Sequence, residues 1–163
     1  AGLVAFNEYF DTFVPASKQV GQMQTLLENL YKQETTFGET DFSALCGHLG
    51  KHVNKRSFLV LYTNFSNMTS LNRQLVYLQQ LARQHRVLVV FFEDADLKEY
   101  IAGKSVTTEE YYRHVIAEKF AFEKRLIVST LKQHGIYSLL TTPDKLSIDV
   151  INKYLEMKSR QLL

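Results

Sequence analysis

The chain has 163 residues, of which 45% are hydrophobic and 12% aromatic, so it is long and apolar enough to fold around a core. Its 19 basic and 17 acidic residues leave a formal net charge of +2, which argues against a dedicated nucleic-acid-binding protein and a polybasic membrane surface. No apolar run approaches the ~20 residues that cross a bilayer, and the single cysteine, Cys46, excludes an internal disulfide framework.

The first third of the chain predicts a β-hairpin and two helices. Residues 2–6 and 9–14 are predicted strands, and the short turn between them implies antiparallel pairing that ends at Pro15. Ser17 is the expected N-cap of the first helix, and a second helix should span about residues 41–53. The expected inner faces carry Val20, Met23, Leu26, Leu27 and Leu30 in the first helix, and Phe42, Leu45, Cys46, Leu49 and Val53 in the second.

Two short apolar runs, residues 57–63 and 86–92, predict strands that are buried on both faces of a sheet. A helical pattern capped by Thr69 or Ser70 joins them. Asn64 follows the first run, and Glu93 and Asp94 follow the second. The order strand, helix, strand is typical of a parallel α/β sheet, in which ligands bind at the carboxyl ends of the strands. We therefore expect any functional site to lie near Asn64.

The second half of the chain predicts further helices and one more strand. Thr107 to Glu110 form a capping box for a long helix that should end near Gln133, before Gly135. A short helix is expected at 96–102, a strand at 136–140, and a last helix that begins at Thr142 and Pro143. The expected inner residues are Tyr112, Val115, Ile116, Phe120, Ile127 and Leu131 in the long helix, and Leu146, Val150, Ile151, Tyr154 and Leu155 in the last one.

Five strands that alternate with helices predict an α/β fold with a three-layer, doubly wound Rossmann-like sheet. The sheet should be mostly parallel with one antiparallel edge strand, and residues 1–163 should form a single domain. The chain opens at the edge of a strand without an initiator methionine. We therefore expect it to be the C-terminal fragment of a longer protein.

Several segments carry a family resemblance when they are taken together and in order. They are residues 2–6 with the hairpin that follows, 40–45, 56–65, 81–89 and 151–158. These segments resemble the bacterial family called domain of unknown function 58, a von Willebrand factor A-like domain. The resemblance covers nearly the whole chain. It implies a preceding central strand with an Asp-x-Ser-x-Ser motif, so strands 2–6 and 57–63 should not pair directly.

The resemblance also implies a metal-ion-dependent adhesion site at the carboxyl ends of the strands. Mg²⁺ prefers hard oxygen ligands, and the family supplies a threonine and an aspartate besides the missing motif. The threonine position matches Thr40, and the aspartate position falls on Asn64. Because an amide brings no negative charge, we expect a degenerate or absent site here, with Mg²⁺ possible only in the intact protein. Alternatively, Thr40 caps the following helix and Asn64 binds loop backbone.

Two other groups of side chains are candidate sites. Glu93, Asp94 and Asp96 either bind a cation or form a solvated turn, and the turn is favoured. His48 and His52 lie four residues apart, so they can share a metal on one helix face, although two exposed histidines beside a core Cys46 are favoured.

We expect a non-enzymatic protein-interaction domain whose partner binds near Asn64, Phe65, Glu93 and Asp94. The resemblance implies that the partner is a MoxR-type AAA+ ATPase in an assembly or chaperone-like system. It also implies a cytoplasmic domain of an inner-membrane-anchored protein, with membrane-spanning segments outside this chain. The alternative is a metal-dependent hydrolase or phosphotransferase that uses Asn64, Glu93 and Asp94. A third reading is a structural domain that packs against the rest of a larger protein.

Overall fold

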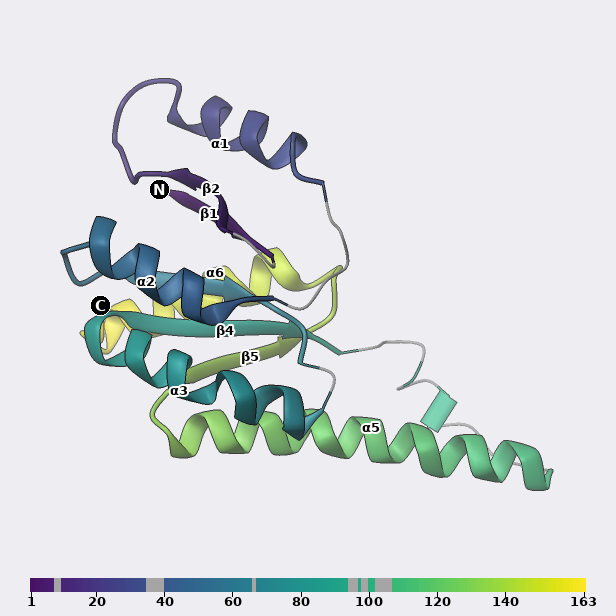
Figure 1. Ribbon diagram of the computed structural model, residues 1–163. Coiled ribbons are helices and arrows are strands. Elements are labelled where there is room, and N and C mark those ends of the chain that lie inside the picture. The colour runs from purple at the N-terminus through teal and green to yellow at the C-terminus, as the bar shows by residue number, and fades with distance from the viewer. Residues whose placement is uncertain (8–9, 35–39, 66, 94–96, 98–99, 102–106) are drawn as a thin grey trace. The chain divides into compact units, whose positions relative to one another are not determined.

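A computed structural model describes residues 1–7, 10–34, 40–65, 67–93, 97, 100–101 and 107–163 (Figure 1). The chain divides into two compact units, Ala1–Asn54 and Lys55–Leu163, and each is described by itself. Five strands are present among the described residues, as the sequence predicts.

The first unit contains the predicted hairpin and two helices. Strands β1 (Leu3–Phe6) and β2 (Phe10–Val14) pair antiparallel, with Leu3 opposite Val14, which confirms the predicted hairpin. Helix α2 (Phe42–His52) buries four of the five residues expected to face inward, while the fifth, Val53, is its half-buried C-cap. The rings of Phe6 and Phe42 meet edge to face at 5.5 Å. Its N-cap is Asp41, whose carboxylate accepts hydrogen bonds from the backbone N–H groups of residues 43 and 44. The cap is therefore not Thr40.

Helix α1 (Gln22–Tyr31) differs from its prediction in both start and packing. Its N-cap is Gly21, whose φ of 90° favours glycine, while the Ser17 hydroxyl accepts a hydrogen bond from the Gln19 N–H in the preceding turn. Leu26 alone is buried within α1. The other apolar residues expected to face inward are exposed, namely Val20, Met23, Leu27 and Leu30.

The second unit is built on a three-stranded parallel sheet in the order β3-β4-β5. Its strands are β3 (Phe58–Tyr62), β4 (Arg86–Phe92) and β5 (Tyr137–Thr141). Helices α3 (Met68–Gln84) and α5 (Thr108–Gln133) lie on one face, and α6 (Leu146–Ser159) lies on the other (Figure 1). Residues 87–91 of the central strand are all buried. The predicted mixed α/β class is confirmed at this level.

The antiparallel hairpin is a sheet of its own, which differs from the predicted single sheet with an antiparallel edge strand. Strands β1 and β3 belong to separate sheets. The doubly wound, von Willebrand A-like arrangement as a whole stays a prediction.

Three helix starts test the predicted caps. Asn67 caps α3 in a capping box with Ser70, in place of the expected Thr69 or Ser70. The capping box of Thr107 and Glu110 is confirmed. Helix α6 begins only at Leu146, because residues 142–145 form a turn that is closed by a hydrogen bond from the Lys145 N–H to the Thr142 carbonyl. Proline suits the second position of such a turn as well as a helix start.

The inner faces of the last two helices are only partly as predicted. Ile127 and Leu131 of α5 are buried, whereas its more N-terminal apolar residues Tyr112, Val115, Ile116 and Phe120 are exposed. In α6 the fully buried residue is Met157, while Ile151, Tyr154 and Leu155 are exposed. The short helix expected at 96–102 lies largely outside the described residues.

Candidate functional site

The carboxyl ends of β3, β4 and β5 meet at one edge of the parallel sheet, where the sequence predicts the site. The backbone continues the ladder just past the strands: the Thr63 N–H donates to the Val90 carbonyl at 3.0 Å, and the Glu93 N–H donates to the Thr141 carbonyl at 2.9 Å. Asn64 and Glu93 are therefore held at this edge by the sheet itself. Asp94 and Asp96 lie outside the described residues.

Asn64 is bound by a lysine from a distant part of the chain. The Lys124 Nζ atom of α5 donates a hydrogen bond to the Asn64 Oδ1 atom at 2.5 Å. Because an ammonium group only donates, the amide oxygen must face Lys124, and the amide nitrogen is left with its two N–H donors. Asn64 is exposed and Lys124 is half-buried, so the pair borders solvent.

The surroundings of Lys124 are unusually apolar for an ammonium group. The Nζ atom lies 5.6 Å from the centre of the ring of Phe91, a fully buried residue of β4. Desolvation by burial lowers the pKa of Lys124, since removal of water disfavours the charged form. None of the ion pairs among the described residues involves Lys124.

The described residues at this edge, Asn64 above all, are poorly arranged for a divalent cation. The oxygen of Asn64 that would coordinate Mg²⁺ accepts a hydrogen bond from a positively charged group. A cation bound there would have to displace the ammonium and remain beside it. Among the described residues, no group of three or more His, Cys, Asp or Glu side chains is arranged to hold a metal ion.

A second polar contact at the same edge links β5 to α6. The hydroxyl of Thr141, which is 3% exposed, donates to the Asp149 Oδ2 atom at 2.5 Å. Thr141 is the last residue of β5, and Asp149 lies in the first turn of α6. A carboxylate near a helix N-terminus also interacts favourably with the helix dipole. This pair fixes the start of α6 against the end of the sheet.

The other predicted site residues are placed as follows. Thr40 lies in the first unit and Asn64 in the second, so each is described within its own unit. Phe65 is 3% exposed and anchors the loop after β3 from within, and Glu93 is half-buried. Their roles in partner or metal binding stay predictions.

The histidines of α2 form a small aromatic cluster with the hairpin. The rings of His48 and His52 stack at 4.0 Å, and the ring of Phe13 lies 5.0 Å from that of His48. The backbone carbonyl of His48 lies 3.0 Å from the His52 Nδ1 atom. Desolvation, with the nearby charges of His52 and Lys51, lowers the pKa of His48. Cys46 is buried, as predicted, and burial raises the pKa of its thiol to about 11.

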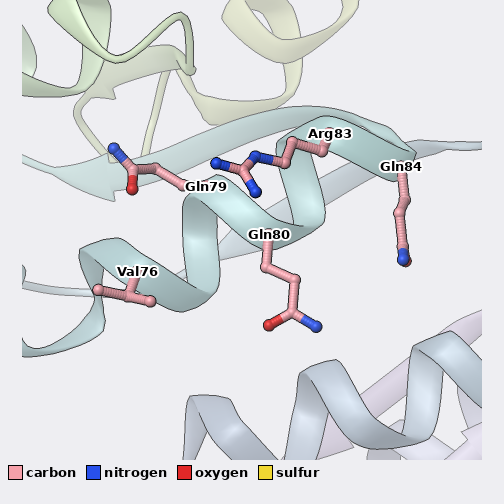
Figure 2. Close-up of a pocket in the computed structure, with 5 residues that line it drawn as sticks. All are labelled: Val76, Gln79, Gln80, Arg83 and Gln84. Atoms are coloured by element: carbon pink, nitrogen blue, oxygen red, sulfur yellow. The ribbon is translucent and has the colours of Figure 1, made fainter.

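A hollow in the second unit lies away from the candidate edge. It has a volume of about 370 Å³ and lies over the second half of α3, where four of its five lining residues have polar side chains (Figure 2). The lining residues are Val76, Gln79, Gln80, Arg83 and Gln84. Since α3 runs back from the end of β3 to the start of β4, this hollow lies toward the amino ends of the strands.

Sequence reasoning missed Lys124, whose ammonium contacts the predicted site residue Asn64. One signal was available. Ala117, Lys124, Ile127 and Leu131 follow one another at intervals of 7, 3 and 4 residues, which places them on one face of a helix. The other three residues of this face are buried. A lysine in the inward stripe of a helix is a candidate for a polar role at the end of the sheet.

Comparison with known proteins finds no matching family model, no similar curated protein and no similar solved structure. Within the described residues, no helix combines the length and the apolar character that a membrane span requires.

Proposed function

We propose that this chain is a non-enzymatic protein-interaction domain of the von Willebrand A-like type. Its partner is a MoxR-type AAA+ ATPase in an assembly or chaperone-like system, and its metal-ion-dependent adhesion site is degenerate. The choice of partner rests on the resemblance of segments such as 40–45 and 56–65 to the domain of unknown function 58 family.

One observation supports an interaction function directly: the first two-thirds of α5 expose large apolar side chains. Tyr and Phe are enriched in interfaces, where they bury a large area at a low cost in conformational entropy. A large contiguous patch of exposed apolar side chains commonly marks an interaction site, whereas single exposed apolar residues do not. The residues are Tyr111, Tyr112, Val115, Ile116, Phe120 and Phe122, with exposed fractions between 45% and 66%.

The pairing of Lys124 with Asn64 supports the degenerate character of the metal site. In the family pattern this position holds an aspartate that faces a cation, whereas here an amide faces an ammonium. A partner that binds at this edge would therefore meet a fixed positive charge on the protein itself. Such a site needs no metal to attract an acidic group.

The test is a binding measurement between this chain and a purified MoxR-type ATPase from the same organism, with and without ATP. Saturable binding is expected. Substitution of Tyr112 and Phe120 by glutamate should weaken it at least tenfold, because both side chains would carry charge into an apolar contact. Val76→Glu is the matched control, since Val76 is equally exposed but lies alone on α3.

Two results would contradict the proposal. One is the absence of any binding to the ATPase under conditions in which both proteins are folded. The other is Mg²⁺-dependent turnover of phosphate or carboxylate esters that is lost in Asn64→Ala, since that would favour a metal-dependent hydrolase.

A further inference from the structure

Among the described residues, the ammonium of Lys124 belongs to no ion pair and donates one hydrogen bond, to the Asn64 Oδ1 atom. It is half-buried at the carboxyl edge of the sheet. A lysine ammonium has three N–H donors, so two remain for other acceptors. A charge in this position is costly unless an acceptor meets it, because burial removes part of its hydration.

Asn64 extends the set of donors. Its amide oxygen is directed to Lys124, so its amide nitrogen presents two further N–H groups next to the ammonium. Oδ1 and Nδ2 share one carbon atom, so the free donors of the two residues lie side by side. The exposed position of Asn64 leaves this pair accessible from solvent.

We propose that Lys124 and Asn64 form a metal-independent binding site for a carboxylate group of a protein partner. One carboxylate oxygen accepts from the Lys124 ammonium and the other from the Asn64 amide nitrogen. The fixed ammonium supplies the positive charge that a divalent cation would otherwise supply to an incoming acidic side chain. This inference rests on the proposed interaction function for the origin of the carboxylate.

Charge and shape favour a carboxylate over a phosphate. The site presents a single positive charge and one neutral amide, which balance a monoanion with two oxygens in one plane. Phosphate sites usually combine several cations with a helix N-terminus or a run of backbone N–H groups. The ring of Phe91 beneath the ammonium lowers the local polarity, and this strengthens a charge-assisted hydrogen bond.

The surface beside the site suits a peptide rather than a free small acid. Lys124 belongs to the same helix as Phe120 and Phe122, which are 51% and 59% exposed. An acidic side chain flanked by apolar residues can therefore place its carboxylate on the ammonium and its neighbours on α5.

The test is a titration followed by ¹H–¹⁵N NMR of the full chain, with N-acetyl-glutamate N-methylamide as the probe. Its neutral isostere, N-acetyl-glutamine N-methylamide, is titrated in parallel. The glutamate probe should shift the side-chain amide signals of Asn64 saturably, and the glutamine probe should not. In Lys124→Met the dissociation constant should rise about tenfold or more, because a charge-assisted hydrogen bond is lost.

Two variants control for indirect effects. Lys124→Arg keeps the positive charge, so its dissociation constant should stay within about threefold of the wild-type value. If Lys124→Met weakened binding only by disturbing the local structure, Lys124→Arg would weaken it as well. Lys119→Met removes an exposed lysine from the same helix and should leave the affinity unchanged. Equal shifts by both probes, or unchanged affinity in Lys124→Met, would overturn the inference. Tighter binding of inorganic phosphate than of the glutamate probe would do so too.

The outcome is separable from that of the proposed function. If the glutamate probe binds through Lys124 but the ATPase does not bind, the carboxylate site stands and the proposed partner is wrong. If the ATPase binds the wild-type chain and Lys124→Met equally, the interaction stands and the carboxylate site is refuted. Shifts of the Asn64 signals by MgCl₂ that abolish the effect of the glutamate probe would also refute it.

Discussion

Thr141→Val tests whether the hydroxyl of Thr141 holds α6 to the carboxyl edge of the sheet. The two side chains have nearly the same shape, so the substitution leaves no cavity at a site that is 3% exposed. It removes the hydrogen bond to the Asp149 carboxylate and adds one buried methyl group. A hydrogen bond to a charged acceptor contributes about 1.5–3 kcal/mol, and a buried methyl group offsets about 0.8 kcal/mol.

The free energy of unfolding should therefore fall by about 1–2 kcal/mol, which lowers the urea midpoint by about 0.5–1 M. Urea titrations at pH 7, followed by circular dichroism and by tyrosine fluorescence, measure this change. The pairing itself is isolated by a double-mutant cycle with Asp149→Ala. Asp149→Ala should cost less in the Thr141→Val background than in the wild type, by about 1–2 kcal/mol.

Thr141→Ser is the matched control, because it keeps the hydroxyl and loses only a methyl group. In that background Asp149→Ala should cost as much as in the wild type. A coupling energy below about 0.3 kcal/mol between positions 141 and 149 would refute the reasoning. It would mean that the 2.5 Å contact contributes nothing beyond what water supplies to the carboxylate.

Three further outcomes follow from individual side chains. Alkylation of Cys46 by iodoacetamide at pH 8 should be about 100-fold slower in the folded chain than in the urea-unfolded chain. The reason is that burial raises the pKa of the thiol to about 11 from 9.0, which reduces the fraction of reactive thiolate. Equal rates would contradict this. Burial lowers the pKa of His85 below 6.5, so the unfolded chain binds the proton first and stability should fall as the pH drops below about 6.5. His85→Asn retains an acceptor for the Ser57 N–H and should reduce that loss in urea titrations from pH 7.5 to 5, whereas the exposed control His134→Asn should not. Asp41→Ala should lower the free energy of unfolding by about 1 kcal/mol, because two backbone N–H groups lose their acceptor. Asp41→Asn keeps an oxygen acceptor and should be nearly neutral. Equal effects of both variants would contradict this reasoning.

The sequence predicted the strands and most helices because each carries a local signal. The run 86–92 is uniformly apolar, and such a run is recognisable as a buried strand without knowledge of its neighbours. The capping box at Thr107 is equally local. Caps were mistaken where two good candidates stand close together, as with Thr40 beside Asp41 and with Asn67 near Ser70, since the choice depends on where the chain turns.

The candidate site was predictable only in part, for a different reason. Asn64 follows its strand directly, so its place at the edge of the sheet follows from the order of the elements. Lys124 is 60 residues further along the chain, and its contact with Asn64 depends on how α5 crosses the sheet. Local patterns carry no information on that crossing. The contact of Thr141 with Asp149 depends likewise on the turn that delays the start of α6.

The exposed apolar half of α5 follows from lengths rather than from composition. The helix has 26 residues and is about 39 Å long, whereas the seven residues of β4 span about 23 Å. The C-terminal part of α5 packs on the sheet, as the burial of Ile127 and Leu131 shows (Figure 1). In the part before it, Ala117 is the buried residue. Helical periodicity predicts which residues share a face but not how much of that face a sheet can cover. Lys124 lies where the covered part of the helix gives way to the exposed part, so an ammonium there is both partly desolvated and within reach of a partner.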